Sequence, residues 1–181
     1  MATLWDELLP LVSKLSGRVL DAGCGNGCYA RRCKDEIPSI KQMVGLDIQP
    51  PTTVFYGTTF LQACPDIPHV QAPIESMPFE DATFDGIICW HTLEHSDDAR
   101  GALREFFRIL RPGGLAMISM PGWGQKTGQP RWLVGTPMQM RVFWNAEELA
   151  AAAAAVGLRP MGRPRHDSGG SHTRLFRRPK R

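Results

Sequence analysis

The segment from Arg18 to Gly27 constrains the fold most strongly, because it joins a strand-like run to a turn that holds three glycines. Arg18 to Ala22 have the character of a short strand, and glycines follow at positions 23, 25 and 27. A pattern typical of a helix begins at Cys28. This succession is typical of doubly wound α/β sheets, in which ligands bind beyond the C-terminal ends of the strands.

Strand-like and helix-like segments alternate along the rest of the chain. Strands are expected at 43–48, 69–72, 84–90 and 115–120, and helices at 4–15, 28–37, 54–64, 97–111 and 146–156. The sequence Pro112-Gly113-Gly114 is expected to end the fourth of these helices. The tail predicts two strands around a DSGG turn. We therefore predict an α/β fold with a doubly wound, Rossmann-like, mostly parallel sheet and a C-terminal antiparallel hairpin.

Composition places the chain among single globular domains. Its 181 residues are 43% hydrophobic and 22% charged, which suits one domain over residues 1–181. No apolar run approaches the roughly 20 residues that cross a bilayer, and the first residues carry acids where a signal peptide carries bases. The sequence predicts a cytoplasmic protein without a membrane partner, and it leaves the oligomeric state open.

An acid beside the glycine turn indicates the charge of the ligand. A dinucleotide fingerprint needs glycine at position 28, where this chain has cysteine. The carboxylate of Asp21 would repel a pyrophosphate and favours a cationic group instead. Asp47 follows Gly27 by twenty residues at the end of the next strand, where an acid accepts hydrogen bonds from ribose hydroxyls. The residues predict a positively charged nucleoside, namely S-adenosylmethionine.

Five segments, in order, carry a resemblance to a known family. They are VLDAGCGNG, VGLDIQP, ESMPFEDATFDGIICWHTLEH, ILRPGGLAMISMPG and QMRVFWNAEELAAAAAAVGL. Together they resemble the class I S-adenosylmethionine-dependent methyltransferases, most closely the type 11 group of quinone and small-molecule methyltransferases. The resemblance runs from Arg18 to Leu158.

The resemblance also implies a set of cofactor-binding residues. Asp21, Gly23 and Gly25 would hold the methionyl part, and Asp47 the ribose. The adenine would lie near Ile74, Glu75 and Met77, with backbone groups serving where Pro73 replaces an acid that is common in the family. The predicted cofactor site is completed by Cys24, Ile48 and Trp90.

The sequence HTLEH supplies candidate catalytic residues: His91, Glu94 and His95. These titratable groups are placed to act as a base for an oxygen or nitrogen acceptor. The pattern also matches a zinc-hydrolase motif, which requires one continuous helix and a third ligand. We predict no metal, because the preceding run is strand-like and a sulfonium methyl donor needs no Lewis acid. The alternative to a catalytic role for His95 is a structural one, in which it lies in a loop and forms a hydrogen bond with the backbone.

The acceptor is predicted to be a small molecule with an apolar or aromatic body, which can also carry an anionic group. The support is a segment from Trp123 to Trp144 that is rich in aromatic residues and methionine, with Trp132, Met138 and Met140 inside it. Arg131, Arg141 and the tail could attract an anion.

Three other functions stay open at this point. The first two are an RNA or other macromolecular methyltransferase and a noncatalytic cofactor-binding subunit; the third is the zinc hydrolase. Nucleic acid is the less favoured acceptor, although residues 159–181 hold eight lysines or arginines and one acid, a net charge of +7.

Overall fold

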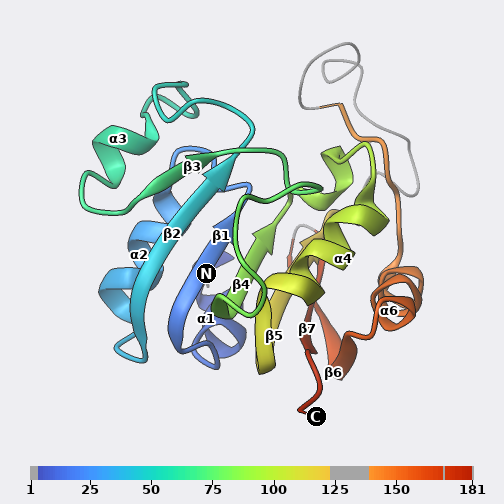
Figure 1. Cartoon of the computed structure of the whole chain (residues 1–181). Coiled ribbons are helices and arrows are strands. Elements are labelled where there is room, and N and C mark those ends of the chain that lie inside the picture. The colour runs from blue at the N-terminus through green and yellow to red at the C-terminus, as the bar shows by residue number, and fades with distance from the viewer. Residues whose placement is uncertain (1–3, 123–138, 169, 181) are drawn as a thin grey trace.

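The computed structural model describes residues 4–122, 139–168 and 170–180 (Figure 1). Its helices are α1 (Leu4–Val12), α2 (Cys28–Glu36), α3 (Phe60–Ala63), α4 (Ala99–Ile109) and α6 (Ala146–Ala155), with one 3-10 turn, η1 (Leu93–His95). Its strands are β1 (Gly17–Ala22), β2 (Ile40–Asp47), β3 (His69–Gln71), β4 (Phe84–Trp90), β5 (Leu110–Met120), β6 (Arg159–His166) and β7 (His172–Arg177).

The strands form one sheet in the order β3-β2-β1-β4-β5-β7-β6. β1 pairs in parallel with both β2 and β4, while β7 is antiparallel to its neighbours β5 and β6. This confirms the predicted mostly parallel sheet and its C-terminal hairpin. The strand order reverses between β1 and β4, so the crevice for a ligand lies beyond the ends of these two strands.

Helices cover both faces of the sheet (Figure 1). One apolar core lies between the sheet and α1, α2 and α3, and includes Trp5, Cys33 and Phe60. The other core lies beneath α4 and α6 and includes Phe106 and Leu149. Because β4 runs between these two cores, Ile87, Ile88 and Cys89 are all buried. The strand expected at 84–90 is thus present and is buried on both faces.

Local caps explain where the helices begin. The Asn145 side chain accepts the N–H groups of Glu147 and Glu148, and the Glu148 carboxylate accepts the N–H of Asn145, both at 2.8–2.9 Å. This reciprocal pair of contacts is a capping box, and it starts α6 at Ala146. Asp98 caps α4 by accepting the N–H of Gly101 at 2.8 Å.

The prediction that Pro112-Gly113-Gly114 ends a helix is wrong. α4 ends at Ile109, because Leu110 takes an extended conformation and pairs with Phe84 of β4. The register then shifts before Gly86 meets Leu115, so the proline and glycines form a bulge inside β5. The expected helix over 54–64 is also shorter, since α3 spans Phe60–Ala63.

Among the described residues, no helix combines the length and the apolar character that crossing a bilayer requires.

Candidate functional site

The glycine turn after β1 is fixed to the end of β2. Gly23 and Cys24 donate their N–H groups to the Leu46 carbonyl at 2.7 and 3.0 Å. Gly23 has φ +82°, and a Cβ there would lie 2.1 Å from the Thr92 methyl carbon. Gly25 has φ +52°, and a Cβ there would find no atom nearer than 3.9 Å. Gly23 therefore lets β4 and the turn approach each other, whereas Gly25 leaves open space on the backbone.

Asp21 is a buried carboxylate in the middle of the sheet, with 2% of its surface exposed. It lies between Gly45 of β2 and Ile88 of β4, and its Oδ2 is buried without a hydrogen-bond partner. Burial raises the pKa of Asp21 to about 7, the nearby Asp47 charge adds to the rise, and the Ala30 N–H opposes it. A cation bound beside Asp21 would stabilise its ionised form.

Asp47 is the last residue of β2, and its carboxylate faces the glycine turn. Oδ2 accepts the N–H of Gly25 and Oδ1 that of Gln49, both at 2.9 Å. Each oxygen retains a lone pair for a further donor. The side chain therefore fixes the turn and can still accept hydroxyl groups.

These three features fit the expected cofactor. The unpartnered oxygen of Asp21 suits a cationic methionyl group, the space at Gly25 admits a close ligand, and Asp47 suits a ribose. Cys24 contributes only its backbone, because its buried thiol points towards Gly45 and burial raises its pKa.

The predicted adenine segment follows β3 at the same edge of the sheet. The Ala72 N–H donates to the Asp47 carbonyl at 3.0 Å, which places this segment beside the end of β2. Ile74 and Met77 are buried in the core, whereas Ile48 is 62% exposed. Of these three predicted cofactor-site residues, Ile48 is the one with an exposed apolar side chain.

The side chain of Glu75 forms hydrogen bonds with the loop before α4, which the sequence pattern around Glu75 did not predict. Its Oε1 accepts the Ser96 hydroxyl and, at 3.1 Å, the Asp97 N–H. The carboxylate therefore holds the loop before α4, and the backbone is left to contact a ligand.

Aromatic rings gather at the end of β4. The Trp90 ring lies 5.7 Å from that of Tyr29 and is stacked on that of His91, with centroids 4.6 Å apart and planes 10° apart. His91 has φ +47°, a left-handed conformation that is uncommon without glycine. Its Nε2 is buried without a partner. Burial lowers the pKa of His91 to about 4, so its ring is neutral at pH 7.

Glu94 and His95 are adjacent, and both form hydrogen bonds with the segment 139–142. The His95 ring donates from Nδ1 to the Gln139 carbonyl at 3.3 Å, and its Nε2 lies 3.9 Å from the Glu94 carboxylate. The bond to a backbone carbonyl is the contact expected under the alternative interpretation of His95, which η1 places in a 3-10 turn. Glu94 is 2% exposed, its carbonyl accepts the N–H groups of Arg141 and Val142, and burial raises the pKa of its carboxyl to about 8.

The three candidate catalytic residues do not lie on one helix. η1 holds Glu94 and His95, whereas His91 precedes it with a left-handed backbone. Within the part of the chain that the structure describes, no three His, Cys, Asp or Glu side chains are grouped to hold a metal ion.

Two contributors to this edge escaped the sequence analysis. The Thr92 hydroxyl donates to the Gly23 carbonyl at 3.3 Å, which joins the end of β4 to the glycine turn. The β6–β7 turn brings Asp167 and His172 close enough to influence the His91 ring electrostatically. Both arise from strand register, which no local spacing encodes. Trp123, Arg131, Trp132 and Met138 lie outside the described residues.

Substituting Glu94 by glutamine is expected to stabilise the protein at alkaline pH. Because the folded-state pKa of Glu94 is about 8 and the unfolded value is near 4.5, its stabilising contribution is present below pH 4.5 and lost as the pH rises through 8. Relative to wild type, the free energy of unfolding of Glu94→Gln should rise by about 1–3 kcal/mol between pH 5 and 9.

Thermal unfolding of both proteins across this pH range measures the difference. Glu80→Gln, at an exposed position, is the matched control and should show no such trend. A Glu94→Gln difference that stays constant with pH would contradict the assignment.

Comparisons with known proteins agree with this geometry. The family described as methyltransferase domain matches residues 1–161. A tRNA U34 carboxymethyltransferase of Saccharophagus degradans is 34% identical over 117 residues, covering 63% of this chain and 35% of the relative. A ubiquinone/menaquinone biosynthesis C-methyltransferase of Geobacter sulfurreducens is 32% identical over 105 residues, covering 56% and 41%. The chain thus matches less than half the length of these relatives.

Solved structures share the fold. The 1,6-didemethyltoxoflavin-N1-methyltransferase of Burkholderia thailandensis, with bound S-adenosylhomocysteine, superposes with a TM-score of 0.70 at 18% identity, covering 96% of this chain and 79% of that one. The glycine turn, the acid at the end of β2 and the strand order are all accounted for by one family. The chain belongs to the methyltransferase domain family, within the class I S-adenosylmethionine-dependent methyltransferases.

Proposed function

We propose that the chain transfers a methyl group from S-adenosylmethionine to a nucleophilic atom of a small molecule, and that His91 serves as the base. The observation that carries this proposal is the buried, unpartnered Nε2 of His91 at the end of β4, beside the glycine turn. The single domain and the cytoplasmic location stay predictions from the sequence.

Different residues around the crevice bind different parts of the cofactor. Asp21 meets positive charge, Gly25 admits the ligand to the backbone, and Asp47 accepts hydroxyl groups. When bound, the sulfonium of the cofactor supplies an activated methyl group. The chain then has to align the acceptor with that methyl group and exclude water, which is where most of the rate enhancement arises.

His91 is suited to take a proton from the acceptor. Within the described part of the chain its Nε2 has no hydrogen-bond partner, so this nitrogen can accept an acceptor's O–H or N–H proton as the bond to carbon forms. Stacking on Trp90 fixes the plane of the ring, and the neutral form is present throughout the physiological pH range. Glu94 and His95 support this arrangement by anchoring residues 139–142.

Aromatic surfaces support an aromatic or apolar acceptor. Tyr29, Trp90 and His91 place three rings in succession near the crevice. Stacked rings of this kind suit a flat molecule. The relatives reported above act on different acceptors according to their names, so the class of acceptor rests on these rings.

A methyl-transfer screen with labelled cofactor tests the proposal. The panel comprises phenols, amines, quinone precursors, sugars and RNA. Selective labelling of aromatic small molecules is expected. Selective labelling of RNA would replace the small-molecule acceptor by a macromolecular one. Intact cofactor binding without transfer to any acceptor would identify a noncatalytic cofactor-binding protein.

Affinity for the cofactor should rise with pH around neutrality. Because the pKa of Asp21 is about 7, its charged form grows between pH 6 and 8 and attracts the cationic cofactor increasingly well. Calorimetric titration should show a Kd that falls by about fivefold to tenfold over this range. Asp21→Asn should bind weakly with no such trend, and an identical trend in both proteins would reject Asp21 as the titrating group.

A further inference from the structure

Among the described residues, the arginines of the C-terminal hairpin form no ion pair with an acid, whereas most arginines of the preceding part of the chain do. Among the described residues, every ion pair of an arginine or lysine lies between positions 31 and 141. Arg159, Arg163 and Arg165 are exposed on β6 and take part in none of them. The positive charge of the hairpin is therefore available to a partner.

The register of the hairpin concentrates this charge further. Arg159 of β6 lies directly opposite Arg177 of β7, and both are exposed. Like charges in directly opposed positions destabilise a sheet unless an anion lies between or above them. β6 bulges between Met161 and Arg165, so Arg159 and Arg165 lie opposite residues only four positions apart on β7, and the three β6 arginines fall within a row roughly 13 Å long. This row, with Arg177, is called the arginine edge below.

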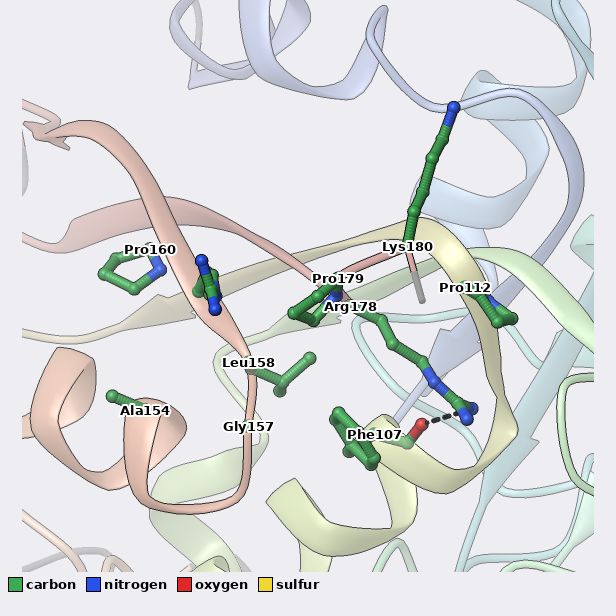
Figure 2. Close-up of a pocket in the computed structure, with 10 residues that line it drawn as sticks. Phe107, Pro112, Ala154, Gly157, Leu158, Pro160, Arg178, Pro179 and Lys180 are labelled. Atoms are coloured by element: carbon green, nitrogen blue, oxygen red, sulfur yellow. Dashed lines mark hydrogen bonds between the residues drawn. The ribbon is translucent and has the colours of Figure 1, made fainter.

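A pocket of about 570 Å³ adjoins the arginine edge, because Arg159 is one of its lining residues. Figure 2 shows other residues that line this pocket. Phe107 and Leu158 are apolar residues of its lining, and Arg159 contributes charge. The Lys180 side chain extends away from Phe107 and Leu158 (Figure 2). Arg178 is already engaged, because its guanidinium donates to the Phe107 carbonyl at 2.9 Å and covers the Phe107 ring. An apolar lining beside a cation suits a base together with its phosphate.

Other partners fit this surface less well. Pro160 and Pro164 interrupt the hydrogen-bonding edge of β6, so a peptide cannot extend the sheet there. Among the described residues, the large hydrophobic side chains that are exposed lie elsewhere, at positions 48, 54, 56, 61 and 143. The edge therefore lacks the apolar centre of a protein interface and the apolar anchors of a membrane-binding surface.

The residue type and the shape favour a single strand of nucleic acid. Residues 159–181 hold seven arginines and one lysine, and arginine binds phosphate through two parallel hydrogen bonds. β7 is paired on both sides, so the hairpin does not project as a ribbon that could enter a duplex groove. RNA offers such accessible single strands in its loops and at its ends, where proteins commonly bind it.

We propose that the arginine edge and its pocket bind single-stranded RNA, with the β6 arginines on successive phosphates and one base in the pocket. The strand β6 leads from this pocket to the β6–β7 turn beside His91, so bound RNA would run towards the crevice. The proposal concerns a binding surface and does not depend on which molecule is methylated.

The test is RNA binding by the full chain without cofactor, measured by fluorescence anisotropy with a 12-nucleotide RNA. The triple variant Arg159→Gln, Arg163→Gln, Arg165→Gln should weaken binding at least tenfold. It should also reduce the slope of log affinity against log salt by about 2, as expected for three lost phosphate contacts. Circular dichroism checks that the variant is folded.

A second triple variant, Lys14→Gln, Lys41→Gln, Arg104→Gln, removes the same charge from other exposed positions and should bind as wild type does. Equal losses in both variants would assign the effect to net charge and overturn the proposal. So would absence of RNA binding by wild type. Equal affinity for DNA of the same sequence, or displacement of RNA by polyglutamate at equal charge, would reject RNA as the partner.

Discussion

Replacing His91 by alanine is expected to lower kcat for an oxygen or nitrogen acceptor by about 10²–10⁴-fold, the usual contribution of a positioned base. The Nε2 of His91 is the buried ring nitrogen at the end of β4 that lacks a partner. Since its pKa is about 4, the wild-type rate at saturating cofactor should show no titration of this base between pH 6 and 9.

Two measurements separate a base from a structural residue at this position. Cofactor Kd should change by less than threefold in His91→Ala, because the residues proposed to hold the cofactor are Asp21 and Asp47. His91→Asn is the matched variant, since asparagine tolerates the positive φ of this position but has no ring. Both variants should lose activity equally. A kcat within threefold of wild type in either variant would exclude His91 as the base.

The second large effect is expected on cofactor binding. Asp47→Ala should raise the Kd for S-adenosylmethionine by about 10- to 150-fold, which is the roughly 1.5–3 kcal/mol of hydrogen bonds to a charged group. The substitution also removes the acceptor for the Gly25 N–H, so the glycine turn loses one of its ties to β2. Calorimetric titration gives the Kd directly.

Asp47→Asn separates these two roles. The amide keeps one oxygen for the Gly25 N–H but has no charge and one acceptor fewer. Its Kd is expected to lie between those of wild type and Asp47→Ala. An unchanged Kd in Asp47→Ala would show that the ribose is held elsewhere and would remove Asp47 from the cofactor site.

The fold was predictable because its determinants are local or periodic. The strand predicted at 84–90 and the helix predicted at 146–156 each follow from residues that are adjacent in the sequence. The places of Asp21 and Asp47 in the fold were predictable for the same reason, because each stands at the end of a strand next to a recognisable turn. The bulge at Pro112 to Gly114 was missed because residues that end a helix also suit a strand irregularity.

The surroundings of His91, where the acceptor is proposed to bind, were less predictable. Residues that are distant in the sequence come into contact there only when the strands pair. Thr92 and Gly23 are 69 positions apart, and Asp167 approaches His91 only after β7 pairs with β5. The bond between Glu75 and Ser96 likewise joins two loops whose contact has no sequence pattern. Such contacts follow from strand order, which emerges only once the whole sheet is assembled.

The two outer strands of the sheet have a further consequence for the protein in concentrated solution. β3 has only three residues, and β6 carries Pro160 and Pro164 together with charged side chains. Neither border offers the long, flat row of free amide and carbonyl groups on which fibrils grow by adding strands from other molecules. The folded chain is thereby protected at both borders from cross-β aggregation.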